Sequence, residues 1–252
     1  MSKIYKPVAE LRDRAKGFLN GKYGIAIGAF LILGLLQYTV YSAVSMIETL
    51  FEGTASGNTF GAAIAQYAIS LVVEFIGAVV VGIISLGNVF FYLKMNCNLI
   101  PRVSDLFIGF RENAGRNVAV AFILALPQLL VDIPTVLVSI VYFRLGDAGL
   151  MVIMALVTLV TLIIFVVLEL GLMPVPYIIH DFPDYTAKEA VAASFKKMRG
   201  NKARLFGLLL SFIPYYILGL LTFGIGLLWI YPLVEATKAQ FYLDLMNPHT
   251  RE

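Results

Sequence analysis

The chain has 252 residues, of which 60% are hydrophobic and only 14% are charged, and its formal net charge is +3. An ordinary soluble protein has about 45–50% apolar and about 25% charged residues, so this composition excludes a soluble globular domain. It also excludes a disordered chain, because a chain stays unfolded only when it lacks apolar side chains to bury. The single cysteine, Cys97, excludes an intrachain disulfide and a cluster of thiolate metal ligands.

Long apolar runs with few charges predict membrane-spanning helices. A helix needs about 20 mostly apolar residues to cross a hydrocarbon layer about 30 Å thick. The first four runs cover residues 23–47, 53–93, 117–143 and 148–179. The second, third and fourth runs each contain one acid, which is Glu74, Asp132 or Glu169 respectively.

The last apolar run, residues 205–234, carries no charge and is long enough for two helices. Gly224 and Gly226 favour a tight reversal inside it, because glycine adopts positive φ without steric cost. The predicted fifth and sixth spans are therefore residues 204–221 and 226–245. The sequence thus predicts an all-α polytopic membrane protein over residues 1–252, a single domain with six spans arranged as three hairpins.

The positions of the basic residues predict the orientation of these spans. Cytoplasmic loops collect Lys and Arg, and the proposed inner segments carry nearly all of them, whereas the first outer loop holds Glu48 and Glu52. Both termini are therefore expected in the cytoplasm of a multi-pass plasma-membrane protein. Bases in short loops at membrane boundaries favour anionic lipid headgroups, and not nucleic acid, as partners. The bases expected to face headgroups are Arg12, Lys16, Lys22, Arg111, Arg116, Lys196, Lys197, Arg199 and Lys202.

Three similar stretches predict an internal triplication, with repeats at 5–95, 102–179 and 186–246. Each would begin with a cytoplasmic, amphipathic helix at the membrane interface, followed by a break with a glycine and a base, and then by a hairpin. Thr186 and Glu189 form a capping-box pattern that marks the start of the third interfacial helix. The alternative is that any cytoplasmic elbow needs bases and a glycine, without any repeat.

The last third of the chain carries the most specific pattern. It contains Ser194-Phe195-Lys196-Lys197-Met198-Arg199-Gly200-Asn201-Lys202, then Leu221-Thr222-Phe223-Gly224-Ile225-Gly226, and finally Ala239-Gln240-Phe241-Tyr242. This pattern resembles an uncharacterised integral-membrane family catalogued as domain of unknown function 975, common in Gram-positive bacteria. The resemblance implies six spans and a plasma-membrane location, but no established activity. Pro214-Tyr215 departs from the family pattern, and the proline is expected to kink the fifth helix.

Charged side chains inside the bilayer are the candidate functional residues, because burying a charge in hydrocarbon is costly. The candidates are Asp132, Glu74, Glu169, Glu235 and Lys238. Asp132 is the deepest, and the prolines on either side of it loosen the helix, so it is a candidate for gating, cation binding or proton transfer. The structural alternative for each acid is a hydrogen bond or ion pair that locks two helices together. Glu235 and Lys238, three residues apart, are expected to pair with each other.

Two classes of function fit these features. The first, favoured by the scarcity of catalytic side chains, is a non-enzymatic membrane module that binds a lipid, a hydrophobic peptide or a partner transporter subunit. The alternative is a small proton- or ion-coupled transporter or channel that uses Asp132 and Glu74. No cofactor and no metal site are predicted, because His180 and its neighbouring acids lie in a proline-bounded turn that leads into a helix.

Overall fold

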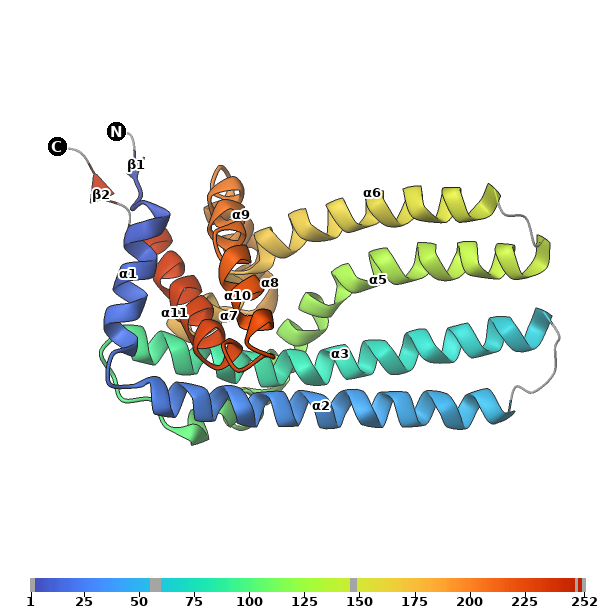
Figure 1. Ribbon diagram of the computed structural model, residues 1–252, viewed down its shortest axis with the longest axis horizontal. Helices are drawn as coiled ribbons and strands as arrows, with labels where there is room; N and C mark the ends of the chain where they lie inside the picture. Colours follow the sequence, from blue (N-terminus) through green and yellow to red (C-terminus); the bar gives the residue numbers. More distant parts are fainter. Residues whose placement is uncertain (1–2, 55–59, 146–148, 248, 251–252) are drawn as a thin grey trace.

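A computed structural model describes residues 3–54, 60–145, 149–247 and 249–250 of the chain. Its helices, in chain order, are α1 (Val8–Leu19), α2 (Tyr23–Thr54), α3 (Phe60–Asn96), the 3-10 helix η1 (Val103–Phe107), α4 (Ile108–Arg111), α5 (Ala114–Leu145), α6 (Gly149–Leu172), α7 (Val175–Asp181), α8 (Ala187–Met198), α9 (Lys202–Leu210), α10 (Ile213–Leu221) and α11 (Leu227–Met246). Two-residue strands, β1 (Lys3–Ile4) and β2 (His249–Thr250), pair antiparallel and hold the two ends of the chain together (Figure 1).

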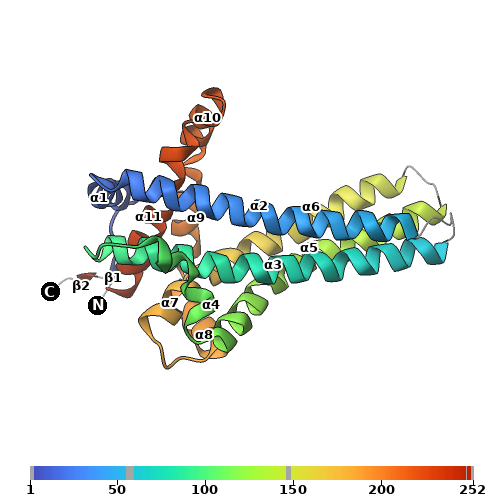
Figure 2. The ribbon, with the colours of Figure 1, turned by 90° about the horizontal axis from the view of Figure 1, so that it is seen from below.

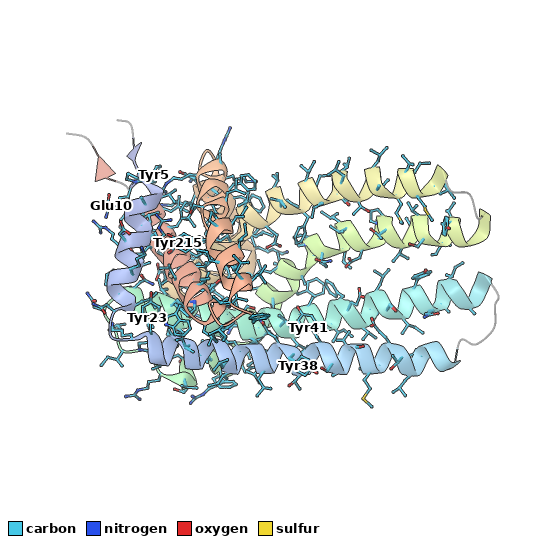
Figure 3. All side chains as sticks on the ribbon, in the orientation of Figure 1. Tyr5, Glu10, Tyr23, Tyr38, Tyr41 and Tyr215 are labelled. Atoms are coloured by element: carbon cyan, nitrogen blue, oxygen red, sulfur yellow. The ribbon has the colours of Figure 1, made fainter. Side chains whose placement is uncertain are left out.

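Helices α2, α3, α5 and α6 form a bundle that runs along the longest axis of the molecule (Figure 1). Large apolar side chains are exposed along all four helices, as Leu35, Ile76, Leu137 and Val160 illustrate. The sticks in Figure 3 show side chains projecting outward along the whole bundle. A helix that is apolar on most of its surface is suited to lipid and not to water.

Five helical segments of the described chain are long and apolar enough to cross a membrane. They are Tyr23–Phe51, Ile64–Asn96, Ala114–Tyr142, Gly149–Asp181 and Lys202–Leu221. Their composition and length confirm the helical, membrane-type chain predicted from the sequence. The first three correspond to α2, α3 and α5 of the long bundle, the fourth comprises α6 and α7, and the fifth comprises α9 and α10.

Helices α1, α9, α10 and α11 lie across one end of the bundle and not along it, in both Figure 1 and Figure 2. Together with α7 and α8 they form a layer that we call the base. Most of the buried apolar residues gather where the base meets the ends of the long helices. The base is therefore the packed core of the molecule, and the far end of the bundle is stabilised by fewer buried contacts.

The sixth predicted span is not confirmed as a span. Its residues form α11, which lies across the bundle and buries most of its side chains against neighbouring helices (Figure 1). Glu235, Thr237, Gln240 and Asp244 are among these buried residues. Because they find polar partners inside the protein, α11 is a core helix of the base, and its polar side chains explain why its hydropathy is too low for a lipid-exposed span.

The fifth predicted span is divided into two helices at the place where the sequence predicts a kink from its proline. Helix α9 ends at Leu210 and α10 starts at Ile213, with Pro214 in the first turn of α10, where the missing N–H of proline costs no helical hydrogen bond. The reversal after α10 uses positive φ at Phe223 (52°) and Gly224 (85°). Gly226 has a different role, because a Cβ there would lie 2.9 Å from the Cα of Gly219.

Short helices precede α2, α5 and α9, at the three positions where the sequence predicts interfacial helices. Their buried residues, such as Leu11, Leu106 and Ala190, belong to or pack against the protein core. In the third, Glu189 N donates to Thr186 Oγ1 (3.3 Å) and Thr186 N donates to Glu189 Oε2 (2.8 Å), which confirms the capping box. The hydrogen bonds with Thr186 lower the pKa of Glu189. That the three short helices lie at a membrane interface stays a prediction.

The three elbows that lead into α2, α5 and α9 each contain a residue with positive φ. These residues are Gly21 (73°), Asn113 (46°) and Gly200 (84°). The glycines of the first and third elbows act as predicted. In the second elbow the prediction is wrong, since Gly115 lies inside α5 and asparagine, which tolerates the left-handed region, makes the turn.

Candidate functional site

A cavity of about 690 Å³ lies between the long helices α2, α3, α5 and α6. Four acids line it, and each comes from a different helix: Glu48 from α2, Glu74 from α3, Asp132 from α5 and Glu169 from α6. No basic side chain is among the described residues that line this cavity. Tyr41, another lining residue, lies near the middle of α2 (Figure 3).

Helical periodicity brings the lining residues of each helix to one face. On α3 these residues are Glu74, Phe75, Gly77, Ala78, Val81, Gly82 and Ser85. Positions three and four residues apart lie above one another on a helix, so the acid and the small residues share this face. A Cβ on Gly77 would lie 2.7 Å from Val44 Cγ2, which shows how closely α2 approaches α3 there. Small side chains therefore allow close helix packing beside the cavity.

The carboxylates at the far end of the cavity interact with one another. Glu74 interacts electrostatically with both Glu48 and Asp132. Gln128 Nε2 donates a hydrogen bond to Asp132 Oδ1 at 2.9 Å, whereas Glu48 Oε1 is buried without a hydrogen-bond partner among the described residues. Because like charges repel, a cluster of three carboxylates favours a bound cation or proton.

The base end of the cavity adjoins a partly buried ion pair. Lys238 Nζ lies 2.7 Å from Glu235 Oε1, which confirms the predicted pairing of these two residues. Asn88 Nδ2 donates to Tyr231 OH (3.1 Å) and to Glu235 Oε2 (3.5 Å). Lys238 also interacts electrostatically with Glu169, the acid at this end of the cavity. The ion pair thus lies next to the cavity but is not part of its lining.

Further polar contacts hold α11 within the base. Arg204 Nη2 lies 2.5 Å from Asp244 Oδ2. Gln240 Nε2 donates to Asn96 Oδ1 at 2.9 Å. Tyr242 OH donates to Asp181 Oδ2 at 2.6 Å. Burial and this hydrogen bond raise the pKa of Tyr242, so its hydroxyl stays protonated. These contacts show a structural role for most of the polar residues on α11.

The structure brings together three of the predicted acids, Glu74, Asp132 and Glu169, in one cavity. Sequence reasoning missed Glu48, because it assigned Glu48 and Glu52 to an outer loop, whereas α2 continues to Thr54 and includes both. The prediction ended this helix at residue 47, where its apolar run ends, and that end is too early. A helix can extend beyond its apolar stretch, and Glu48, three and four residues after Ser45 and Val44, then shares their helical face.

The basic residues expected to face headgroups lie at or near the base layer, but four of them contact protein groups. Lys16 Nζ lies 3.6 Å from Asp13 Oδ1. Arg12 stacks on the ring of Tyr215, 5.4 Å from its centroid (Tyr215 is labelled in Figure 3). Arg116 donates to the carbonyl of Pro183, and Lys202 Nζ donates to the carbonyl of Val167 at 3.0 Å. Headgroup contact for the whole set stays a prediction.

The protein therefore belongs to the class of helical proteins that have several helices apolar enough to cross a membrane. Four of these helices surround an acidic cavity. The chain belongs to the family described as "Protein of unknown function (DUF975)", whose sequence model matches residues 1–248. The family resemblance of the sequence is therefore confirmed. No curated protein and no solved structure matches this chain.

Proposed function

We propose that this chain is an integral plasma-membrane protein that binds a cationic, amphipathic ligand without catalysing a reaction. One observation carries the proposal: each of the four long helices contributes one acid to the same cavity, and no described lining residue is basic. Carboxylates attract a cation more strongly beside a hydrocarbon layer than in bulk water, because the effective dielectric constant is lower there. The same carboxylates repel anionic ligands.

The size and lining of the cavity indicate the class of ligand. Small-molecule sites usually have about 300–1,000 Å³, and the volume of about 690 Å³ falls within this range. Phe75, Leu124 and Phe165 add apolar surface beside the acids. A hydrophobic amine or a short hydrophobic peptide with a positive charge matches both features. A bare metal ion would leave most of this volume and all of the apolar surface unused.

The proposal is tested by comparing two ions of similar size and opposite charge. Tetraphenylphosphonium is expected to bind the purified protein in nanodiscs, measured by calorimetry, and tetraphenylborate is not. The double variant Glu74→Gln with Asp132→Asn should weaken binding of the cation at least about tenfold, or about 1.4 kcal/mol. Glu10→Gln, which changes a half-buried acid on α1 outside the cavity lining, is the control and should bind as the parent does. Equal binding of both ions, or an unchanged double variant, would contradict the proposal.

A second candidate, a proton- or ion-coupled transporter, is supported by the spread of the acids along the bundle. Glu48 lies near the far end of α2, whereas Glu169 lies near the base end of α6. Pro127 and Pro134 interrupt the hydrogen bonding of α5 on either side of Asp132. Uptake of tetraphenylphosphonium into proteoliposomes, driven by a pH gradient and lost in Asp132→Asn, would support transport. Binding without any uptake would favour the non-enzymatic binding module.

The topology that supports this function is also open to test. We infer that the four long helices span the bilayer, that both termini are cytoplasmic, and that α9 and α10 lie within the cytoplasmic half of the membrane. Phe223, at the reversal between α10 and α11, is 98% exposed. The variant Phe223→Cys should therefore not react with a membrane-impermeant maleimide applied to intact cells.

Two control positions calibrate this labelling, and Cys97→Ser removes the only native thiol. Glu52→Cys, near the far end of α2, should react from outside. Asn20→Cys, in the turn before α2, should react only after the cells are permeabilised. External labelling at position 223 would instead support the sixth span predicted from the sequence.

A further inference from the structure

A second, smaller cavity lies between the base and the bundle, where α9 crosses α6. This groove has a volume of about 470 Å³. Its walls are apolar side chains of both helices, including Ile163 and Val166 of α6 and Phe206 of α9. Lys202, the first residue of α9, is the charged side chain among the described residues that line it. The groove is separate from the acidic cavity and shares no lining residue with it.

Lys202 has no carboxylate partner within the part of the chain that the structure describes. Its Nζ donates to the carbonyl of Val167 at 3.0 Å and lies 5.2 Å from the centre of the Phe195 ring. Both contacts hold the ammonium group at the edge of an apolar groove, but neither neutralises its charge. An ammonium ion has three donors, so donors remain for an anion.

The walls of the groove belong to the lipid-facing surface of the protein. Ile163 is 57% exposed and Phe206 is 43% exposed. The bilayer around such a surface supplies apolar groups in the form of acyl chains. A lysine near the end of a membrane-spanning helix extends its ammonium group toward the headgroup level, where phosphates lie. Apolar walls with one cation at the rim match the two parts of a phospholipid.

We propose that the groove between α6 and α9 binds an anionic phospholipid, with one acyl chain against Ile163, Val166 and Phe206 and the phosphate on Lys202. This site is independent of the ligand proposed for the acidic cavity. It differs from general contact with the bilayer, because the crossing of α9 over α6 creates a concave wall and Lys202 adds charge selectivity. Binding would stabilise the contact between the base and the bundle.

The experiment measures lipids retained by the full-length protein during native mass spectrometry. The protein is taken from vesicles with equal amounts of phosphatidylglycerol and phosphatidylcholine. The parent is expected to retain phosphatidylglycerol, and Lys202→Gln should lower its retention about fivefold, while Lys202→Arg keeps it. Lys196→Gln, an exposed base on α8, is the matched control and should retain lipid as the parent does.

A second variant tests the apolar part without changing the charge. Ala203 lines the groove and is exposed, so Ala203→Phe should fill the groove and lower retention of phosphatidylglycerol while the protein stays folded. Glycerol 3-phosphate, which has the anion but no acyl chain, should not displace the retained lipid. The proposal is overturned if Lys202→Gln retains phosphatidylglycerol as the parent does, or if Lys196→Gln loses as much. Displacement by glycerol 3-phosphate would also overturn it, since the site would then recognise a free phosphate.

Discussion

Replacement of Gly87 by alanine is expected to lower the stability of the protein by at least about 3 kcal/mol, at the upper end of the cost of overpacking a core. A Cβ at this position of α3 would lie 1.8 Å from the carbonyl oxygen of Leu106 and 2.4 Å from its carbonyl carbon. Both atoms belong to the backbone, so no side-chain rotation can relieve the clash. Helix η1 would have to move away from α3.

Such a movement would disturb further contacts, because η1 also carries Asp105, whose Oδ1 lies 3.0 Å from Lys94 Nζ on α3. Leu106 itself is buried in the core. Thermal unfolding of the purified protein in detergent measures the effect. Gly34→Ala is the control, because a Cβ on Gly34 of α2 meets no atom within 4 Å. Unfolding of Gly87→Ala at the same temperature as Gly34→Ala would show that α3 and η1 are not packed as the structure describes.

Removal of one partner of the Glu235–Lys238 pair is expected to destabilise the base strongly. Lys238→Met leaves the Glu235 carboxylate, 7% exposed, without its cation, and should cost about 3 kcal/mol. Glu235→Gln should cost less, because the Lys238 side chain is 29% exposed and still interacts with Glu169. The double variant should regain much of the loss, since it leaves no unpaired charge.

These three variants separate a structural from a functional role of the pair. Their unfolding temperatures, combined in a double-mutant cycle, give the interaction energy between the two side chains. Binding of tetraphenylphosphonium to Glu235→Gln tests the link to the cavity, since Lys238, once released from Glu235, is free to neutralise Glu169 and should weaken binding. If each single variant unfolds as the parent does, the charges are not paired in a buried environment.

Much of the secondary structure was predictable because local patterns carry it. The apolar runs predicted helices, and Pro214 predicted a kink in residues 204–221, where the structure has two helices. Thr186 and Glu189 predicted a helix start. Each of these features depends on residues within a few positions along the chain. Such interactions are the same in any tertiary arrangement, so sequence reasoning could find them.

The direction of α11 was not predictable from its own residues. Glu235, Lys238 and Asp244 made it a poor candidate for a span, but the sequence did not show which partners they would meet. Glu235 meets Asn88 from α3, and Asp244 meets Arg204 from α9. These partners are distant in sequence. Only the packing of the whole base decides whether a polar helix lies in the core or crosses a bilayer.

The sequence by itself determined that this protein consists largely of helices apolar enough for a membrane, because the solvent that suits a helix depends on its own side chains. The tertiary structure alone decided that Glu48, Glu74, Asp132 and Glu169 line the same cavity. It also decided that α9, α10 and α11 lie across the bundle (Figure 2). The rotation of a helix about its axis and the angle at which it crosses another depend on how side chains of both helices interlock. That information belongs to pairs of helices and is absent from any single stretch of sequence.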